Sequence, residues 1–158
     1  MKKLLITAVI FFTAVTLFSF SNYKSINANG FSNDSLEAAK QMYVDQINGY
    51  IAGKENMASD SVFKDIEMLK GVPAEHLLKI MQNGFSTALG VGCDHCHNTS
   101  DFASNEKNAK QIARKMMEMS GQIRDLLSNI KEIQSDKPTI NCTTCHRGEI
   151  VPALKIRN

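Results

Sequence analysis

The pattern of apolar and polar residues divides the chain into a continuous apolar run near its start and a longer region with apolar residues at helical spacing. The run Leu4–Phe20 follows two lysines and contains no charged residue. This arrangement is typical of an export signal, although its length is also close to the roughly 20 apolar residues that span a membrane. We predict that residues 1–28 are a signal peptide cleaved at Ser21 or Ala28, with a retained membrane anchor as the alternative. Residues 29–158 form one predicted domain.

Two amphipathic helices are predicted in the first half of this domain. The first covers residues 35–51 and follows a capping residue at Asp34 or Ser35. The second covers residues 72–89 and opens with Pro73, whose missing N–H costs nothing in a first turn. The short apolar piece between them, Val62–Leu69, fits either a strand or an extended segment.

A third, longer helix is predicted for residues 105–133, with Ser104 as its cap and the sequence "SDKP" as its end. The second and third helices each lead into the same short motif, "CDHCH" after the second and "CTTCH" after the third. A helix followed by a Cys-x-x-Cys-His motif therefore occurs twice.

The two motifs contain all four cysteines of the chain. Cys93 and Cys96 precede His97 in the first, and Cys142 and Cys145 precede His146 in the second. A c-type haem uses all three residues of such a motif, because the thiols form thioethers with the two vinyl groups and the histidine becomes an axial ligand of the iron. The sequence therefore predicts two covalently bound haem c groups.

Other uses of paired cysteines explain the motifs less well. A redox dithiol is expected at a helix start within alternating strands and helices, a pattern that is absent from this sequence. A zinc site could use four thiolates, but it gives no reason for a histidine after each second cysteine. Zinc binding and structural disulfides remain the alternatives.

Methionine is the expected type of second axial ligand, because the chain after residue 28 has seven methionines and only two histidines outside the motifs. Met81 lies in the middle of the apolar face of the second helix, with Ala74, Leu77, Phe85 and Ala88 within about 40° of it. We predict that Met81 binds the iron of the first haem, the alternative being ordinary core packing. His76 lies about 140° away and is predicted to face solvent. His95 lies between the attachment cysteines and is poorly placed to bind iron.

The second haem needs a ligand from upstream or from another chain, because no Met, His or Cys follows His146. The third helix offers Met116, Met117 and Met119. Met116 lies in the middle of its apolar face, Met119 about 60° to one side and Met117 about 100° to the other. Helical geometry alone leaves both ligation and core packing open for Met116.

The charge balance excludes some classes of partner. The chain has 18 basic and 16 acidic residues, and removal of residues 1–28 takes away three lysines and no acid. The remaining domain is nearly neutral, so neither a nucleic-acid partner nor a strongly basic membrane-binding face is indicated.

The sequence resembles the cytochrome subunit of photosynthetic reaction centres, a four-haem protein, and its short two-haem relatives. The resemblance covers roughly Ile51–Leu154. It is carried by the segments "IAGKEN", "VFKDIEMLKGVPAEHLLKIM", "LGVGCDHCHN", "FASNEKNAKQIARKMMEM" and "NCTTCHRG". The chain has two haem motifs where the full subunit has four, and it has no segment for docking to a photosynthetic core.

The resemblance implies a mostly α-helical multihaem cytochrome c fold with little or no sheet. In it, two units of a helix and a Cys-x-x-Cys-His motif would be related by a local pseudo-twofold axis. Residue by residue, it implies Met81 as ligand of the first iron and Met116 as ligand of the second. It also favours a contact between Arg147 and a haem propionate over a plain surface charge.

The sequence-based expectation is a periplasmic or membrane-tethered electron carrier, not an enzyme, that relays single electrons in a respiratory chain. Its expected partners are redox proteins such as a quinol-oxidising complex, a terminal oxidase or other cytochromes. A dihaem peroxidase or small-molecule reductase is the alternative. Such an enzyme would need an open iron and acid/base groups near it, for which His76 and His95 are the only candidates. A zinc-stabilised binding module is a third possibility.

Overall fold

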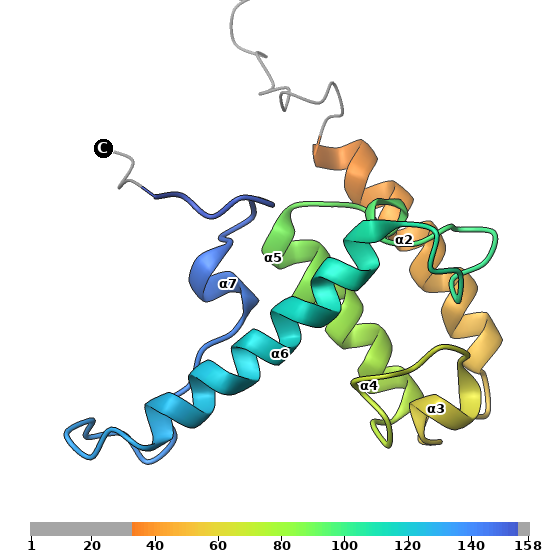
Figure 1. Ribbon diagram of the computed structural model, residues 1–158. Coiled ribbons are helices and arrows are strands. Elements are labelled where there is room, and N and C mark those ends of the chain that lie inside the picture. Colours follow the sequence, from red (N-terminus) through yellow and green to blue (C-terminus); the bar gives the residue numbers. More distant parts are fainter. Residues whose placement is uncertain (1–32, 155–158) are drawn as a thin grey trace, which may run out of the picture. The chain divides into compact units, whose positions relative to one another are not determined.

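The computed structural model describes residues 33–154, and the chain divides into two compact units after Ser35. The account below concerns the second unit. Every regular element there is a helix, and the described residues contain no strand, only isolated bridges between Ala58 and Pro73 and between Asn98 and Asp101 (Figure 1). The mostly helical prediction is therefore confirmed. The predicted signal or anchor, residues 1–28, lies outside the described part of the chain.

Helix α2, Asn33–Ile51, confirms the first predicted helix and begins slightly before the predicted cap. It buries Val44 and Ile51, which are seven positions apart and therefore lie on one face. A small core forms where this face meets the following segments, and it consists of Val44, Ile51, Val62, Ala74 and Leu78, with Ile47 and Phe63 packed against it.

The segment between α2 and the second predicted helix contains only the short helix α3, Ser59–Val62. Val62–Leu69 is therefore not a strand, and after Val62 it is an irregular, bent segment. Backbone hydrogen bonds close this segment into a compact loop, with Ser59 N–H donating to the Val72 carbonyl at 2.7 Å and Ala74 N–H donating to the Met57 carbonyl at 2.9 Å.

The second predicted helix is present but is divided into three pieces. These are α4, Ala74–Lys79, the π-helix η1, Ile80–Ser86, and the single turn α5, Thr87–Leu89. Gly90 ends α5 with a left-handed φ of 67°, the usual way for glycine to close a helix. In η1 the backbone N–H groups bond five residues back, as Thr87 N–H does to the Gln82 carbonyl, so this part of the helix is wider than an α-helix.

The third predicted helix is α6, Asn108–Ser128, which is shorter than predicted at both ends. Ser104 is not its cap. The Ser104 hydroxyl accepts a hydrogen bond from Glu106 N–H at 3.3 Å, and Lys107 occupies the cap position without any side-chain cap. The Ser104 carbonyl accepts instead from the Lys110 ammonium, so it is not used to begin a helix.

The second motif forms the short helix α7, Cys142–Cys145, which a capping box between Asn141 and Thr144 begins. Helix α7 contacts η1 and α5. Gly148 N–H donates to the Ala88 carbonyl at 2.8 Å, and a Cβ atom added to Gly90 would overlap the Gly148 carbonyl oxygen. The chain after the second motif is therefore fixed to the helix that precedes the first. The pseudo-twofold relation stays a prediction.

None of the helices in residues 33–154 combines the length and the apolar character needed to cross a membrane.

Candidate haem sites

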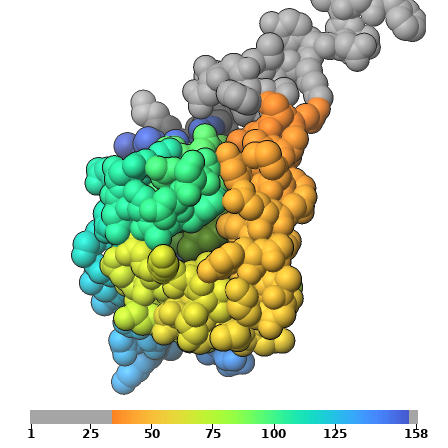
Figure 2. Space-filling view, turned by 90° about the vertical axis from the view of Figure 1, so that its right-hand side faces the viewer, coloured from red at the N-terminus to blue at the C-terminus, as the bar shows by residue number. Residues whose placement is uncertain are grey.

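A cavity of about 500 Å³ lies between α2, the 63–69 segment, the consecutive helices α4, η1 and α5, and α6. Figure 2 shows a hollow bounded by α2 in orange, by a yellow segment and by the green chain around residue 100. This volume is within the range of pockets that hold cofactors. Most of the wall is apolar, and it includes Tyr43, Val44, Ile47, Phe63, Leu77 and Phe85.

All three residues predicted to attach the first haem, Cys93, Cys96 and His97, line this cavity. The 3₁₀ turn η2, Cys93–His95, begins the motif, and His97 N–H donates to the Cys93 carbonyl at 3.0 Å. Both cysteines are free and half-buried. Burial raises the pKa of both thiols, so they remain protonated at neutral pH.

The orientation of His97 is fixed by a backbone carbonyl. Its ring atom Nδ1 lies 3.0 Å from the carbonyl oxygen of Phe102, which can only accept a hydrogen bond. Nδ1 therefore carries the proton, and Nε2 is free to bind a metal. Burial also lowers the pKa of His97, which keeps the imidazole in the neutral form that a metal ligand requires. The Phe102 ring packs against the imidazole with 5.3 Å between centroids.

Met81 lines the same cavity and is half-buried, so the predicted ligand set of the first haem is brought together around one space. Met81 lies in the π-helix η1. Short π-helical segments often occur at functional sites, since one extra residue in the turn redirects nearby side chains.

The second motif repeats the histidine geometry of the first. His146 Nδ1 lies 3.0 Å from the carbonyl oxygen of Glu149, so its Nε2 is also free for a metal. Cys142 is half-buried and Cys145 is exposed, and both are free thiols. Each motif thus offers two thiols that can form thioethers with vinyl groups and a histidine Nε2 that can bind iron, which are the groups that a c-type haem requires.

An exposed apolar row follows α6, and it consists of Ile112, Met116, Met119 and Leu126, with Ile130 just beyond the helix. Met116 is 43% exposed and Met119 is 45% exposed. Met117 lies on another face of α6, is half-buried and lines the first cavity. The structure thus separates Met117 from the other two methionines, as their helical angles predict.

The other candidates lie away from this cavity wall. His76 and His95 are exposed and do not line the cavity, which agrees with the solvent-facing position predicted for His76. Arg147 is exposed and has a left-handed φ of 52°.

Across residues 33–154, no three His, Cys, Asp or Glu side chains are grouped as a zinc site would require.

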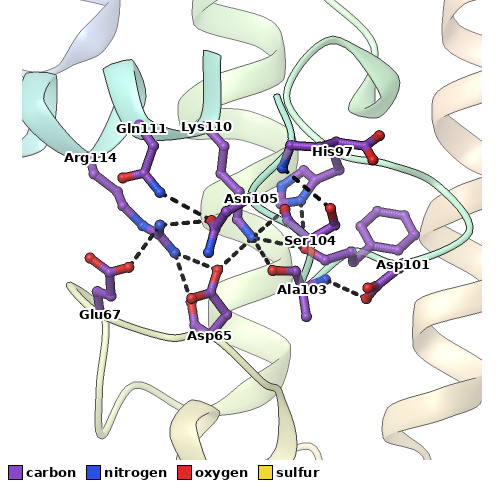
Figure 3. Close-up of polar contacts among 12 residues, drawn as sticks. Asp65, Glu67, His97, Asp101, Ala103, Ser104, Asn105, Lys110, Gln111 and Arg114 are labelled. Atoms are coloured by element: carbon purple, nitrogen blue, oxygen red, sulfur yellow. Dashed lines mark hydrogen bonds and ion pairs between the residues drawn. The ribbon is translucent and has the colours of Figure 1, made fainter. Parts of the chain in front are cut away.

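Sequence reasoning missed an ionic network beside the first cavity, which Figure 3 shows. Asp65 has a left-handed φ of 63°, and its carboxylate accepts from Lys110 at 2.7 Å and from Arg114 at 2.8 Å. Arg114 also pairs with Glu67 at 2.8 Å and donates to the Asn105 side chain at 3.0 Å. The Lys110 hydrogen bond, together with Arg114, holds the pKa of Asp65 well below its usual range. Only the tertiary fold brings Asp65 to α6, so no local pattern could have indicated the network.

Comparison with known proteins identifies one family. The model of the photosynthetic reaction centre cytochrome c subunit matches residues 23–156. Cytochrome c-554 of Chloroflexus aurantiacus is 34% identical over 85 residues, which are 53% of this chain and 20% of that protein. The photosynthetic reaction center cytochrome c subunit of Rubrivivax gelatinosus is 38% identical over 80 residues, 43% of this chain and 22% of the relative. The subunit of the same name from Roseobacter denitrificans is 27% identical over 105 residues, 64% and 28% of the two chains. The chain thus matches 20–28% of the length of these relatives.

Proposed function

Because the chain belongs to the family of photosynthetic reaction centre cytochrome c subunits, we propose that it carries single electrons through two covalently bound haem c groups. One observation carries this proposal. In each Cys-x-x-Cys-His motif, Nδ1 of the histidine donates to a backbone carbonyl at 3.0 Å, and Nε2 is therefore free. In this tautomer each histidine can bind iron through Nε2, and each motif has its own pair of thiols.

At the first site, Cys93 and Cys96 would hold the haem through thioether bonds, with His97 and Met81 as the axial ligands. Each bound haem supplies a reversible one-electron couple, with a higher potential under histidine–methionine ligation than under bis-histidine ligation. The mostly apolar wall of the cavity would pack against the porphyrin, and the fixed tautomer of His97 keeps its Nε2 directed at one position.

At the second site, Cys142 and Cys145 would form the thioethers and His146 would be one axial ligand. We assign the other to Met116, which lies on the exposed apolar row of α6 and away from the first cavity. A porphyrin packed on this row would cover apolar side chains that are otherwise in contact with water. Arg147, exposed directly after His146, is our candidate for contact with a propionate.

A carrier is favoured over a peroxidase or reductase by Met81, which lines the first cavity and would fill the second axial position of the iron. An open iron that reduces peroxide needs an acid/base group beside it. The two histidines considered for that role, His76 and His95, are exposed and do not line the cavity, whereas Met81 does.

The location and partners follow from the export signal predicted for residues 1–28 and from the family. We place the protein in the periplasm, free or tethered to the outer side of the cytoplasmic membrane. There it would exchange electrons with a quinol-oxidising complex, a terminal oxidase or other cytochromes. A photosynthetic role is not part of the proposal.

The test is a haem count per chain together with oxidised and reduced spectra. Wild-type protein should carry two covalent haems and show the charge-transfer band of methionine bound to ferric iron. Cys93→Ala/Cys96→Ala should leave one haem or prevent accumulation, because the small core loses a porphyrin. Cys142→Ala/Cys145→Ala is the matched control and should leave the other haem. Two covalent haems in either double variant would overturn the assignment, and rapid stoichiometric binding of carbon monoxide by the reduced wild type would favour the enzyme alternative.

A further inference from the structure

The Lys110 ammonium is buried next to the loop that holds His97. Lys110 is 9% exposed, and its Nζ donates to the carbonyls of Phe102, Ala103 and Ser104 at 3.1, 2.9 and 3.1 Å. It also pairs with Asp65 at 2.7 Å. Removing an ammonium group from water is costly unless its donors are used, and here the carboxylate and the three carbonyls use them.

One of these carbonyls links Lys110 to the predicted iron ligand. The Phe102 oxygen accepts both from Lys110 Nζ at 3.1 Å and from His97 Nδ1 at 3.0 Å. Figure 3 shows this path from Asp65 through Lys110 to the loop beside His97. A carbonyl that accepts from a cation is a poorer acceptor for its second donor, so the Lys110 charge limits how much electron density His97 gains through its Nδ1–H bond.

We propose that Lys110 is a positioning residue for His97. Lys110 holds the Phe102 carbonyl in place and raises the reduction potential of the haem attached to Cys93 and Cys96. Asp65 opposes this effect, because its carboxylate neutralises part of the Lys110 charge. The inference rests on the proposed haem function, but it concerns residues to which neither the motifs nor the family comparison gives a role.

The two members of the pair are expected to act in opposite directions, which separates positioning from simple stabilisation. Lys110→Met removes a positive charge and frees the Phe102 carbonyl to accept more strongly from His97. Both changes favour the oxidised, more positive state and lower the potential. Asp65→Asn leaves the Lys110 charge less neutralised and should raise the potential. A network that only held the fold together would loosen in both variants, admit water to the cavity and shift the potential downward in both.

The experiment is a redox titration of the purified protein with both haems attached. The two potentials are assigned by finding which one changes in Met116→Ala. Mutation of a residue that hydrogen-bonds to a metal ligand typically changes metal affinity or activity by about 10- to 100-fold. We therefore expect each variant to shift the first haem's equilibrium by about tenfold, or 59 mV for one electron. The second haem is the internal control, and Lys115→Met is the matched variant, since it removes a lysine from an exposed ion pair with Glu118 on the same helix.

Opposite shifts in Lys110→Met and Asp65→Asn, with no shift in Lys115→Met, would support the proposal. If Lys110→Met does not accumulate, an upward shift in Asp65→Asn supports it alone. Shifts in the same direction, no shift, or loss of haem from both variants would overturn it and leave the network a structural role. A wild-type protein without two covalent haems would instead refute the proposed function.

Discussion

Replacing Met116 by alanine separates a packing role from an iron-binding role, because the side chain has little packing to lose within the chain. Full burial of a methionine contributes about 1.5–3 kcal/mol. Met116 is 43% exposed, so its truncation should lower the free energy of unfolding by only about 1 kcal/mol through lost packing. Met119 on the same row would lose similar contacts with a porphyrin, so an iron that opens in Met116→Ala but not in Met119→Ala must have lost a ligand.

We expect Met116→Ala to open one iron, which would then bind carbon monoxide when reduced, have a lower potential and lose about half of the charge-transfer band of the protein. Met119→Ala is the matched control, since Met119 belongs to the same apolar row and is 45% exposed. That variant should lose a similar amount of packing and keep both irons closed. The reasoning would be refuted if Met119→Ala opened the second iron, or if Met116→Ala left it closed.

Deleting Asn83 should convert the π-helix to α-helical register and shift Met81 from its place in the cavity wall, so the spectrum should weaken in the methionine band of that haem. Gly90→Ala should lower the free energy of unfolding by about 3 kcal/mol in thermal denaturation, because the new Cβ overlaps the Gly148 carbonyl and the left-handed φ is strained. Acidification below about pH 4, the usual pKa of an unfolded aspartate, should destabilise the protein. The pKa of Asp65 is depressed in the folded state, so its stabilising effect is present above that pH and is lost as pH falls; circular dichroism should show a weaker pH dependence in Asp65→Asn.

The parts of the structure that local chemistry determines could be predicted from the sequence. Apolar residues at helical spacing predict α2 and α6, because burial of one face is what stabilises a helix of that length. The covalent chemistry of haem attachment predicts the roles of Cys93, Cys96 and His97, and the cavity wall brings all three together with Met81.

The features that depend on distant contacts could not be predicted. The helical-angle argument assumes 100° per residue throughout, and no pattern around Met81 indicates that the turn from Ile80 to Ser86 is a π-helix. The sequence predicts too early a start for α6, because Ser104 is a good capping residue by type. Its carbonyl is instead bound by Lys110, whose position depends on Asp65 in another part of the chain.

The hydrogen bond from Gly148 to Ala88 closes the chain between them into a loop, and the two attachment motifs lie just inside its ends. Each doubling in the length of a flexible loop costs only about 0.6 kcal/mol, so the 129–137 segment, which is exposed except at Ile133, can accept insertions at little cost. The residues next to the closure cannot, since Gly90 leaves no room for even one additional carbon atom beside Gly148. The fold can therefore accept changes in chain length far from the closure, whereas the contact between Gly90 and Gly148 constrains the spacing between each motif and its nearer end of the loop.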